Sequence, residues 1–281
     1  MDAWVLAACW AQTESAPTVA QVFPVALTVL AEAERHQAGI RAVLTTGVDR
    51  FTQPPDSVLI ADALGASTAL TASVNNSCAS VVSAIDLCAA YIQVDEPSCA
   101  IVTASSGLAT YRSNPSATHE VNGVGALLVG NISGGLRIVS STHFTDARFH
   151  GLKVIQATGC DNRPQVFCED REHALWKEYR ERANSAPIAV MNSILRQNHW
   201  TISEVDSWVL HQSELTDEWV RRLGIASQPI APRAGSVSCI AQLERILMNK
   251  HVRKHRVAVL EIGLGLTVSA MLLETVSKGE K

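Results

Sequence analysis

The stretch Asn75-Asn76-Ser77-Cys78-Ala79-Ser80-Val81-Val82-Ser83-Ala84-Ile85-Asp86-Leu87 decides the fold, because an apolar strand predicted at residues 70–74 turns there into a long apolar helix. The unpaired N–H groups at a helix N-terminus favour a thiolate over a thiol. The small side chains of Ala79 and Ser80 leave room for an acyl group beside Cys78. A lone cysteine is more often simply buried. Cys78 is therefore a candidate nucleophile whose role depends on the rest of the chain.

The composition excludes several classes of protein. With 281 residues and 47% hydrophobic residues, the chain can form one large domain or two closely packed halves. A net charge of −4 gives no reason to expect nucleic acid or an anionic membrane as a partner. No run is long enough to span a bilayer, and no basic segment precedes an apolar one at the N-terminus, so we expect a cytoplasmic protein without a signal peptide. The seven cysteines are irregularly spaced without a CxxC pair, which predicts reduced thiols and neither a disulfide framework nor a zinc site.

Hydrophobic patterning predicts alternating helices and strands in both halves of the chain. The expected strands are residues 3–8, 40–47, 70–74, 99–104, 124–129, 136–142, 205–210, 256–262 and 267–273. The expected helices are residues 19–37, 58–64, the one that follows Cys78, 172–197, 215–223 and 238–248. Residues 146–171 read as an irregular insertion with a turn at residues 159–162. This alternation is typical of a layered α/β fold.

Four segments together resemble a thiolase-superfamily condensing enzyme, closest to the β-ketoacyl-acyl-carrier-protein synthase III group. They are the nucleophile turn at residues 76–80, the glycine-rich strand at residues 121–128 with Asn122 at the family's Asp, the strand that ends in His211-Gln212, and the closing loop Gly263-Leu264-Gly265. The resemblance covers roughly residues 20–275. It implies a thiolase-like α-β-α-β-α fold of two pseudo-repeated halves. Residues 1–135 would carry the cysteine, and residues 136–281 would carry the histidine and the closing loop.

The resemblance also implies a chemistry. Cys78 would accept an acyl group from a thioester, while the backbone N–H groups of Cys78 and Leu264 would hold the oxyanion. His211 would support thiolate formation and polarise the carbonyl of the second substrate. The resemblance assigns substrate binding to Gly263, Gly265 and Gln212. The substrate would be a thioester of coenzyme A or of the phosphopantetheine of an acyl carrier protein, with no metal and no permanently bound cofactor.

The departures from the family concern the third catalytic residue and the substrate channel. Ser236 stands where the family has an Asn that helps to bind the enolate of a decarboxylated malonyl group, so decarboxylative condensation is less expected than other acyl transfer. An alternative is that Ser236 is a turn residue without a role. About eighteen residues precede the helix at 19–37 where the family has about fifty. Acidic Asp217-Glu218 replaces a basic residue that the family uses for carrier binding, and a displaced basic patch would have to come from Arg221, Arg222, Arg245 and Arg253-Lys254.

Three functions follow from these features. The first is an acyltransferase or β-ketoacyl synthase III-like enzyme of fatty-acid, polyketide or other secondary-metabolite biosynthesis that works through an acyl-Cys intermediate. The second is a shortened, non-catalytic partner subunit of a heterodimeric ketosynthase, and the third is an acyl-thioester hydrolase. Retention of Cys78 and His211 favours the first. We also expect a homodimer or heterodimer, with the apolar strand at residues 99–104 at a sheet edge near the two-fold axis.

Overall fold

The computed structural model describes residues 2–14, 18–35, 38–47, 55–92, 96–106, 121–157, 164–213, 215–225, 235–249 and 254–276. The expected turn at residues 159–162 lies outside this set. All expected helices and strands of the main fold are present, with bounds that differ by a few residues.

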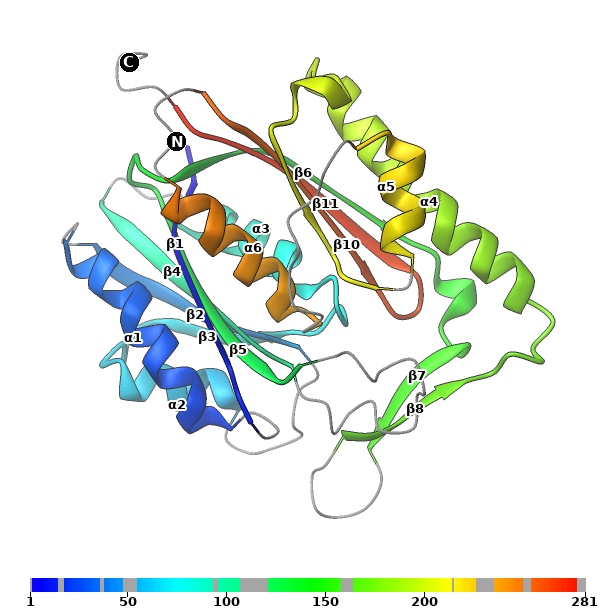
Figure 1. Cartoon of the computed structure of the whole chain (residues 1–281). Coiled ribbons are helices and arrows are strands. Elements are labelled where there is room, and N and C mark those ends of the chain that lie inside the picture. Colours follow the sequence, from blue (N-terminus) through cyan, green and yellow to red (C-terminus); the bar gives the residue numbers. More distant parts are fainter. Residues whose placement is uncertain are drawn as a thin grey trace.

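In the described part of the chain, nine strands form one sheet with two differently built halves (Figure 1). The first half has the order β3 (Leu70–Val74), β2 (Gly39–Gly47), β4 (Ser98–Ser106), β5 (Gly123–Gly130) and β1 (Trp4–Gln12). The second half continues with β6 (Leu136–Thr145), β11 (Thr267–Glu274), β10 (Arg256–Gly263) and β9 (Ser207–Leu210). The halves join where β1 meets β6, through the pairs Trp4 with Arg137 and Val5 with Leu136. This short joint allows the two halves to turn their faces toward a shared layer of helices.

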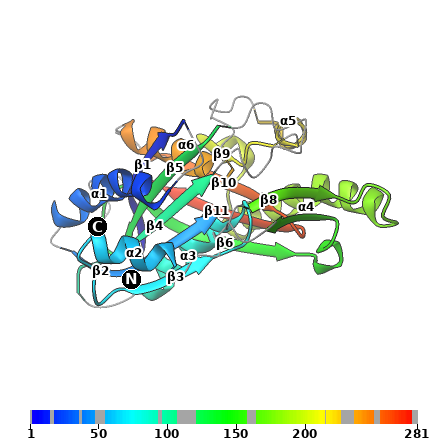
Figure 2. The ribbon, with the colours of Figure 1, turned by 90° about the horizontal axis from the view of Figure 1, so that it is seen from below.

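The helices form three layers around the two half-sheets. The middle layer consists of α3 (Ser80–Tyr91) and α6 (Val237–Met248), whose side chains pack with residues of both halves. On the outside, α1 (Val19–Arg35) and α2 (Asp56–Ala63) cover the first half, and α4 (Trp176–Gln197) and α5 (Thr216–Leu223) cover the second. Both ribbon views place α1 and α2 at the opposite end of the molecule from α4 (Figure 1 and Figure 2). The fold is therefore the layered α-β-α-β-α arrangement expected from the sequence.

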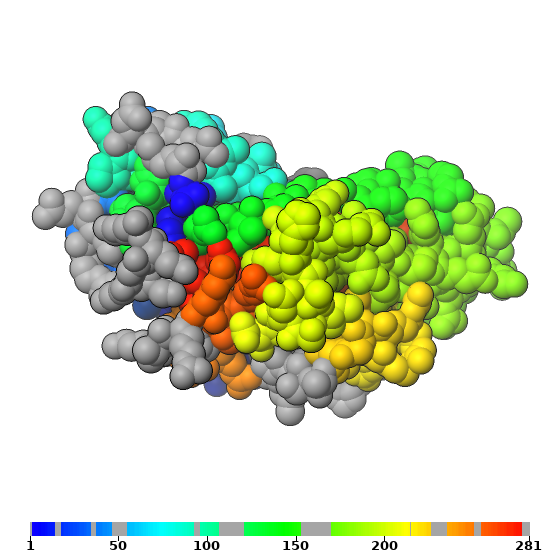
Figure 3. Space-filling view, turned by 90° about the horizontal axis from the view of Figure 1, so that it is seen from above, coloured from blue at the N-terminus to red at the C-terminus, as the bar shows by residue number. Residues whose placement is uncertain are grey.

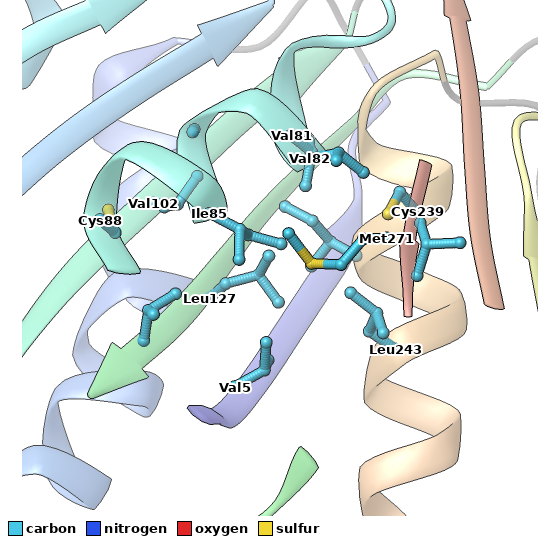
Figure 4. Packing of buried hydrophobic residues seen from close by; sticks show 14 of the residues in the cluster. Val5, Val81, Val82, Ile85, Cys88, Val102, Leu127, Cys239, Leu243 and Met271 are labelled. Carbon is cyan, nitrogen blue, oxygen red and sulfur yellow. The ribbon is translucent and has the colours of Figure 1, made fainter. Parts of the chain in front are cut away.

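The apolar strands divide their residues between the layers. In β10, Val257 and Val259 face the middle layer, while Ala258 and Leu260 face the outer helices. Figure 4 shows the middle core, in which Ile85 of α3 and Leu243 of α6 project toward Met271 of β11. Because such strands are covered on both faces, they read as continuous apolar runs rather than as alternating ones.

The expectation of an irregular insertion at residues 146–171 is wrong. This segment contains a short 3-10 helix, Ala147–Phe149, and an antiparallel hairpin of β7 (Lys153–Ala157) and β8 (Pro164–Glu169). In the described part of the chain the two strands pair only with each other. Their sequences lack the long apolar pattern of the strands in the main sheet, which is why the pattern did not predict them. The helix expected from residue 172 begins at Trp176, after a run of turns.

The expectation that residues 99–104 form a sheet edge is also wrong. The strand β4 lies between β2 and β5, and its apolar character reflects burial on both sides. The first half of the sheet instead ends at β3, where the side chain of Leu70 is exposed.

None of the helices in the described residues is both long enough and apolar enough to traverse a bilayer.

In the space-filling view, blue and cyan residues of the first half lie at one end, and yellow-green and yellow residues, which include α4 and α5, lie toward the other (Figure 3).

Candidate active site

Cys78 lies in a tight turn between β3 and α3. The preceding residue, Ser77, has a φ of +51°, a left-handed conformation that is uncommon for a residue with a side chain. The N–H of Ala79 donates to the carbonyl of Asn76 at 3.1 Å, which closes the turn. The helix proper begins at Ser80, so Cys78 precedes its first residue by two positions and its side chain is half-buried. This placement at the helix N-terminus matches the sequence-based prediction.

The hydroxyl of Ser80 holds the strained turn in place. It accepts the N–H of Asn76 at 2.8 Å and donates to the carbonyl of Ser77. A left-handed residue of this kind costs on the order of 1–3 kcal/mol and persists where its surroundings fix it. Strain concentrated directly before Cys78 is typical of a functional turn.

The closing loop touches the nucleophile turn at Gly263. A Cβ atom on Gly263 would lie 2.5 Å from the carbonyl oxygen of Asn76 and 3.3 Å from the nitrogen of Ala79. It would also lie 2.5 Å from Oγ1 of Thr267. Only glycine permits this approach, which joins two segments about 185 residues apart in the chain.

The rest of the closing loop is a sharp turn between β10 and β11. Gly265 has a φ of +73° and Leu266 a φ of +49°, while the side chain of Leu264 is only partly buried. The packing of Gly263 brings this loop, and therefore the backbone of Leu264, beside the turn that carries Cys78.

His211 follows β9 directly and is buried, with 8% of its surface exposed. Its backbone N–H donates to the carbonyl of Leu260 at 2.9 Å, and its carbonyl accepts the hydroxyl of Thr216 at 2.7 Å. Burial lowers the pKa of the imidazole to about 4, because the charged form loses its hydration. The ring is therefore neutral at neutral pH.

Gln242 of α6 anchors the end of β9 just before His211. Its side-chain oxygen accepts the N–H of Leu210 at 3.2 Å, and its side-chain nitrogen donates to the carbonyl of the same residue at 3.0 Å. The sequence analysis missed this residue. The signal was present, since Gln242 is a lone amide between Ala241 and Leu243 in an otherwise apolar helix segment and is fully buried.

Ser236 lies at the N-cap of α6 and is buried, with 4% of its surface exposed. The residue before it, Gly235, has a φ of +49°, and a Cβ atom there would lie 2.8 Å from Oγ of Ser106 at the end of β4. The N-terminus of α6 thus meets the carboxyl end of a first-half strand. Asn122, at the family's Asp position, is buried directly before β5, where its carbonyl accepts the N–H of Thr13 at 3.0 Å.

The structure brings some of the predicted residues into contact and gives others local partners. Gly263 and the turn of Cys78 are in direct contact, whereas the side chain of Gln212 donates to the carbonyl of Leu210 at 2.9 Å within its own segment. On α5, Arg221 bonds to Glu218 at 2.7 Å, and Arg222 donates to the carbonyl of Asn184 at 3.0 Å. These two arginines of the proposed basic patch are therefore engaged with neighbouring residues.

Comparison with known proteins extends the likeness to nearly the whole chain. No family model matches the sequence, and no curated protein matches it. The priming β-ketosynthase of the R1128 polyketide pathway is 18% identical, with a TM-score of 0.78 over 98% of this chain and 96% of that chain. A 3-oxoacyl-(acyl carrier protein) synthase III from Xanthomonas oryzae is 15% identical, with a TM-score of 0.72 over 97% and 98%.

OleA from Xanthomonas campestris, solved with lauric acid and lauroyl-CoA bound, is 18% identical, with a TM-score of 0.70 over 91% of this chain and 82% of that chain. The similar proteins thus share a fold at low sequence identity. The chain has the thiolase-like fold of the β-ketosynthase III type of condensing enzymes.

Proposed function

We propose that this chain is an acyltransferase of the β-ketosynthase III type, in which Cys78 takes an acyl group from a thioester and passes it to a second substrate. The contact of Gly263 with the turn of Cys78 carries the proposal, because the closing loop, whose backbone N–H groups are the proposed oxyanion donors, packs against the turn that carries the thiol. Acyl transfer through a thiol needs a thiolate, a donor pair for the oxyanion and a path for the proton.

In the first step, the sulfur of Cys78 attacks the thioester carbonyl, and the N–H groups of Cys78 and Leu264 stabilise the tetrahedral oxyanion. Collapse of this intermediate expels the thiolate of coenzyme A or of phosphopantetheine, which takes up the proton that Cys78 released on ionisation. In the second step, the acceptor attacks the acyl-Cys carbonyl and gives up a proton, and the C–S bond breaks to regenerate Cys78, whose thiolate can take up that proton. The field at the start of α3 favours the thiolate at both stages.

The role proposed for His211 follows from its neutral state. An imidazole with a pKa of about 4 is a poor counter-charge for a thiolate, so the helix N-terminus has to supply the stabilisation. A neutral ring keeps one N–H that can polarise a substrate carbonyl. Ser236, shorter than an Asn, supports acyl transfer to an acceptor other than a malonyl-derived enolate.

Lauroyl-CoA in OleA supports an acyl-thioester donor, and the synthase III likeness supports a carrier-protein donor. The test is intact-protein mass spectrometry after incubation with acyl-CoA thioesters of two to twelve carbons, on the wild type, on Cys78→Ala and on Cys88→Ala as a matched control. We expect an acyl adduct in the wild type and in the control, and none in Cys78→Ala. Absence of an adduct on Cys78 with every donor contradicts the proposal and favours a partner subunit. Steady release of free acid without an acceptor favours a hydrolase.

A further inference from the structure

A carboxyl group lies in the apolar middle layer, where the chemistry proposed above has no use for it. Glu261, on β10, is 1% exposed and points toward α3 and α6. Its Oε2 accepts the backbone N–H of Val82 at 2.9 Å, across 179 positions of sequence. Its Oε1 is buried and accepts no N–H or O–H from the residues that the structure describes. A buried carboxyl held in this way needs an explanation.

The bonded N–H belongs to the first turn of α3. Val82 is the third residue of that helix, and its amide is one of the donors that lack a partner within the helix. Ala79 at the N-cap has no side-chain acceptor, so Glu261 caps the helix from another element. Figure 4 shows Val82 and Cys239 projecting from α3 and α6 into the space between these helices.

The end of β10 is attached to the nucleophile segment at two points. Glu261 holds Val82 after Cys78, and two residues later Gly263 packs on Asn76 before it. Any change in the Glu261 side chain acts on the helix end that faces the thiol. A negative charge at this end is itself stabilised by the helix N-terminus and so competes with a thiolate there.

We infer that Glu261 is a positioning residue for Cys78: as a neutral acid it fixes the first turn of α3 and leaves the field of the helix N-terminus to the thiol, and when ionised it opposes the thiolate. The inference rests on the proposed role of Cys78 as the nucleophile. Protonated Glu261 keeps Oε2 as the acceptor for Val82, so the attachment holds in both states and the charge alone changes.

The surroundings support a neutral acid near pH 7. Burial raises the pKa of Glu261 to about 8, although the hydrogen bond from Val82 and the interaction with the Cys239 thiol act in the opposite direction. The elements packed around it carry further titratable or charged groups, namely Asp86, Cys88 and Tyr91 on α3, Cys239, Glu244 and Arg245 on α6, and His211 after β9. Of these described groups only Cys239 interacts with the carboxyl, and its own pKa is raised by burial and by Glu261.

The test is the pH dependence of Cys78 alkylation by iodoacetamide between pH 5 and pH 10, followed by peptide mapping so that only Cys78 is counted. In the wild type we expect a broadened profile that does not fit a single ionisation, because Glu261 and Cys78 titrate together. In Glu261→Gln we expect a single ionisation, with the apparent pKa of Cys78 about one unit lower than in the wild type. Alkylation of Cys78 in this variant should then be faster than in the wild type, by up to about tenfold above pH 8. Glu244→Gln, which alters a different carboxyl, on α6, should retain the wild-type profile.

Two results would overturn the inference. The first is a wild-type profile that fits a single ionisation, a measurement that does not depend on the folding of any variant. The second is superimposable profiles for the wild type and Glu261→Gln. Glu261→Leu removes the acceptor as well as the charge, so a purely structural role predicts lower stability in that variant and no change of profile in Glu261→Gln. Alkylation uses no thioester. A shifted profile in a protein that never forms an acyl adduct would therefore refute the proposed function while leaving the role of Glu261 intact.

Discussion

Replacement of Gly263 by alanine should disable Cys78 without unfolding the protein. The added Cβ would lie 2.5 Å from both the carbonyl oxygen of Asn76 and Oγ1 of Thr267, where real contacts are not shorter than 3.0 Å. The hydroxyl of Thr267 can rotate away, but the backbone carbonyl cannot. The closing loop and the nucleophile turn must therefore separate by at least about 0.5 Å.

The expected loss follows from that displacement. A misplacement of about 1 Å in a catalytic constellation costs roughly a hundredfold in rate, and loss of one oxyanion donor costs on the order of a hundred- to a thousandfold. We expect acylation of Cys78 by an acyl-CoA to slow by roughly tenfold to a hundredfold, since the shift is smaller than a full ångström. The φ angle of Gly263 lies outside the left-handed region, so steric contact alone accounts for the effect.

The assay is the initial rate of adduct formation, followed by intact-protein mass spectrometry. Gly151→Ala is the matched control, because a Cβ at Gly151 meets nothing within 4 Å, and it should react at the wild-type rate. Thermal unfolding of both variants verifies that they are folded. Acylation of folded Gly263→Ala at the wild-type rate would refute the reasoning that the loop and the turn form one oxyanion site.

Four further outcomes are expected. Limited iodoacetamide should label Cys78 before any other cysteine in peptide maps, and preferential labelling of Cys160 would contradict its assignment. Ser236→Asn should raise malonyl-thioester decarboxylation roughly a hundredfold while acylation is unchanged, as measured by release of carbon dioxide; efficient decarboxylation by the wild type would leave Ser236 without this role. The pKa of His211 is lower in the folded chain than in the unfolded chain, so the free energy of unfolding falls as the pH drops and the unfolded state takes up the proton. Between pH 7 and pH 4.5, urea unfolding of the wild type should show a loss of stability about 2 kcal/mol larger than that of His211→Gln. An equal loss in both proteins would show that the proton is taken up at another group. Sedimentation at micromolar concentration should show a dimer. Leu87→Asp should weaken it, since Leu87 is an apolar side chain that is 55% exposed on α3 and is a candidate contact between the two copies. A monomeric wild type would contradict a dimer contact at this surface.

The sequence predicted the main strands and helices because each is a long apolar run with a clear stop. The strand Leu70–Val74 agrees at both ends, and α5 ends before Gly224 in the left-handed conformation that a helix C-terminus favours. The position of β4 within the sheet was not predictable, since an apolar run does not state which strands flank it.

The candidate site was predictable where a residue acts through its own segment. The placement of Cys78 before α3 depends on local turn chemistry and agrees with the prediction. The bond of Glu261 to Val82 and the bonds of Gln242 to Leu210 join segments that are 179 and 32 positions apart. Such contacts depend on how the layers stack, which no local pattern records.

The two bonds of Gln242 also determine how the sheet ends. β9 is the outermost described strand of the second half, and its neighbour β10 occupies one side only. The side-chain amide of Gln242 meets the N–H and the carbonyl of Leu210 as the peptide group of a tenth strand would. A foreign strand can therefore not pair at Leu210 without displacing α6, and this edge is protected from intermolecular β-pairing by a single amide.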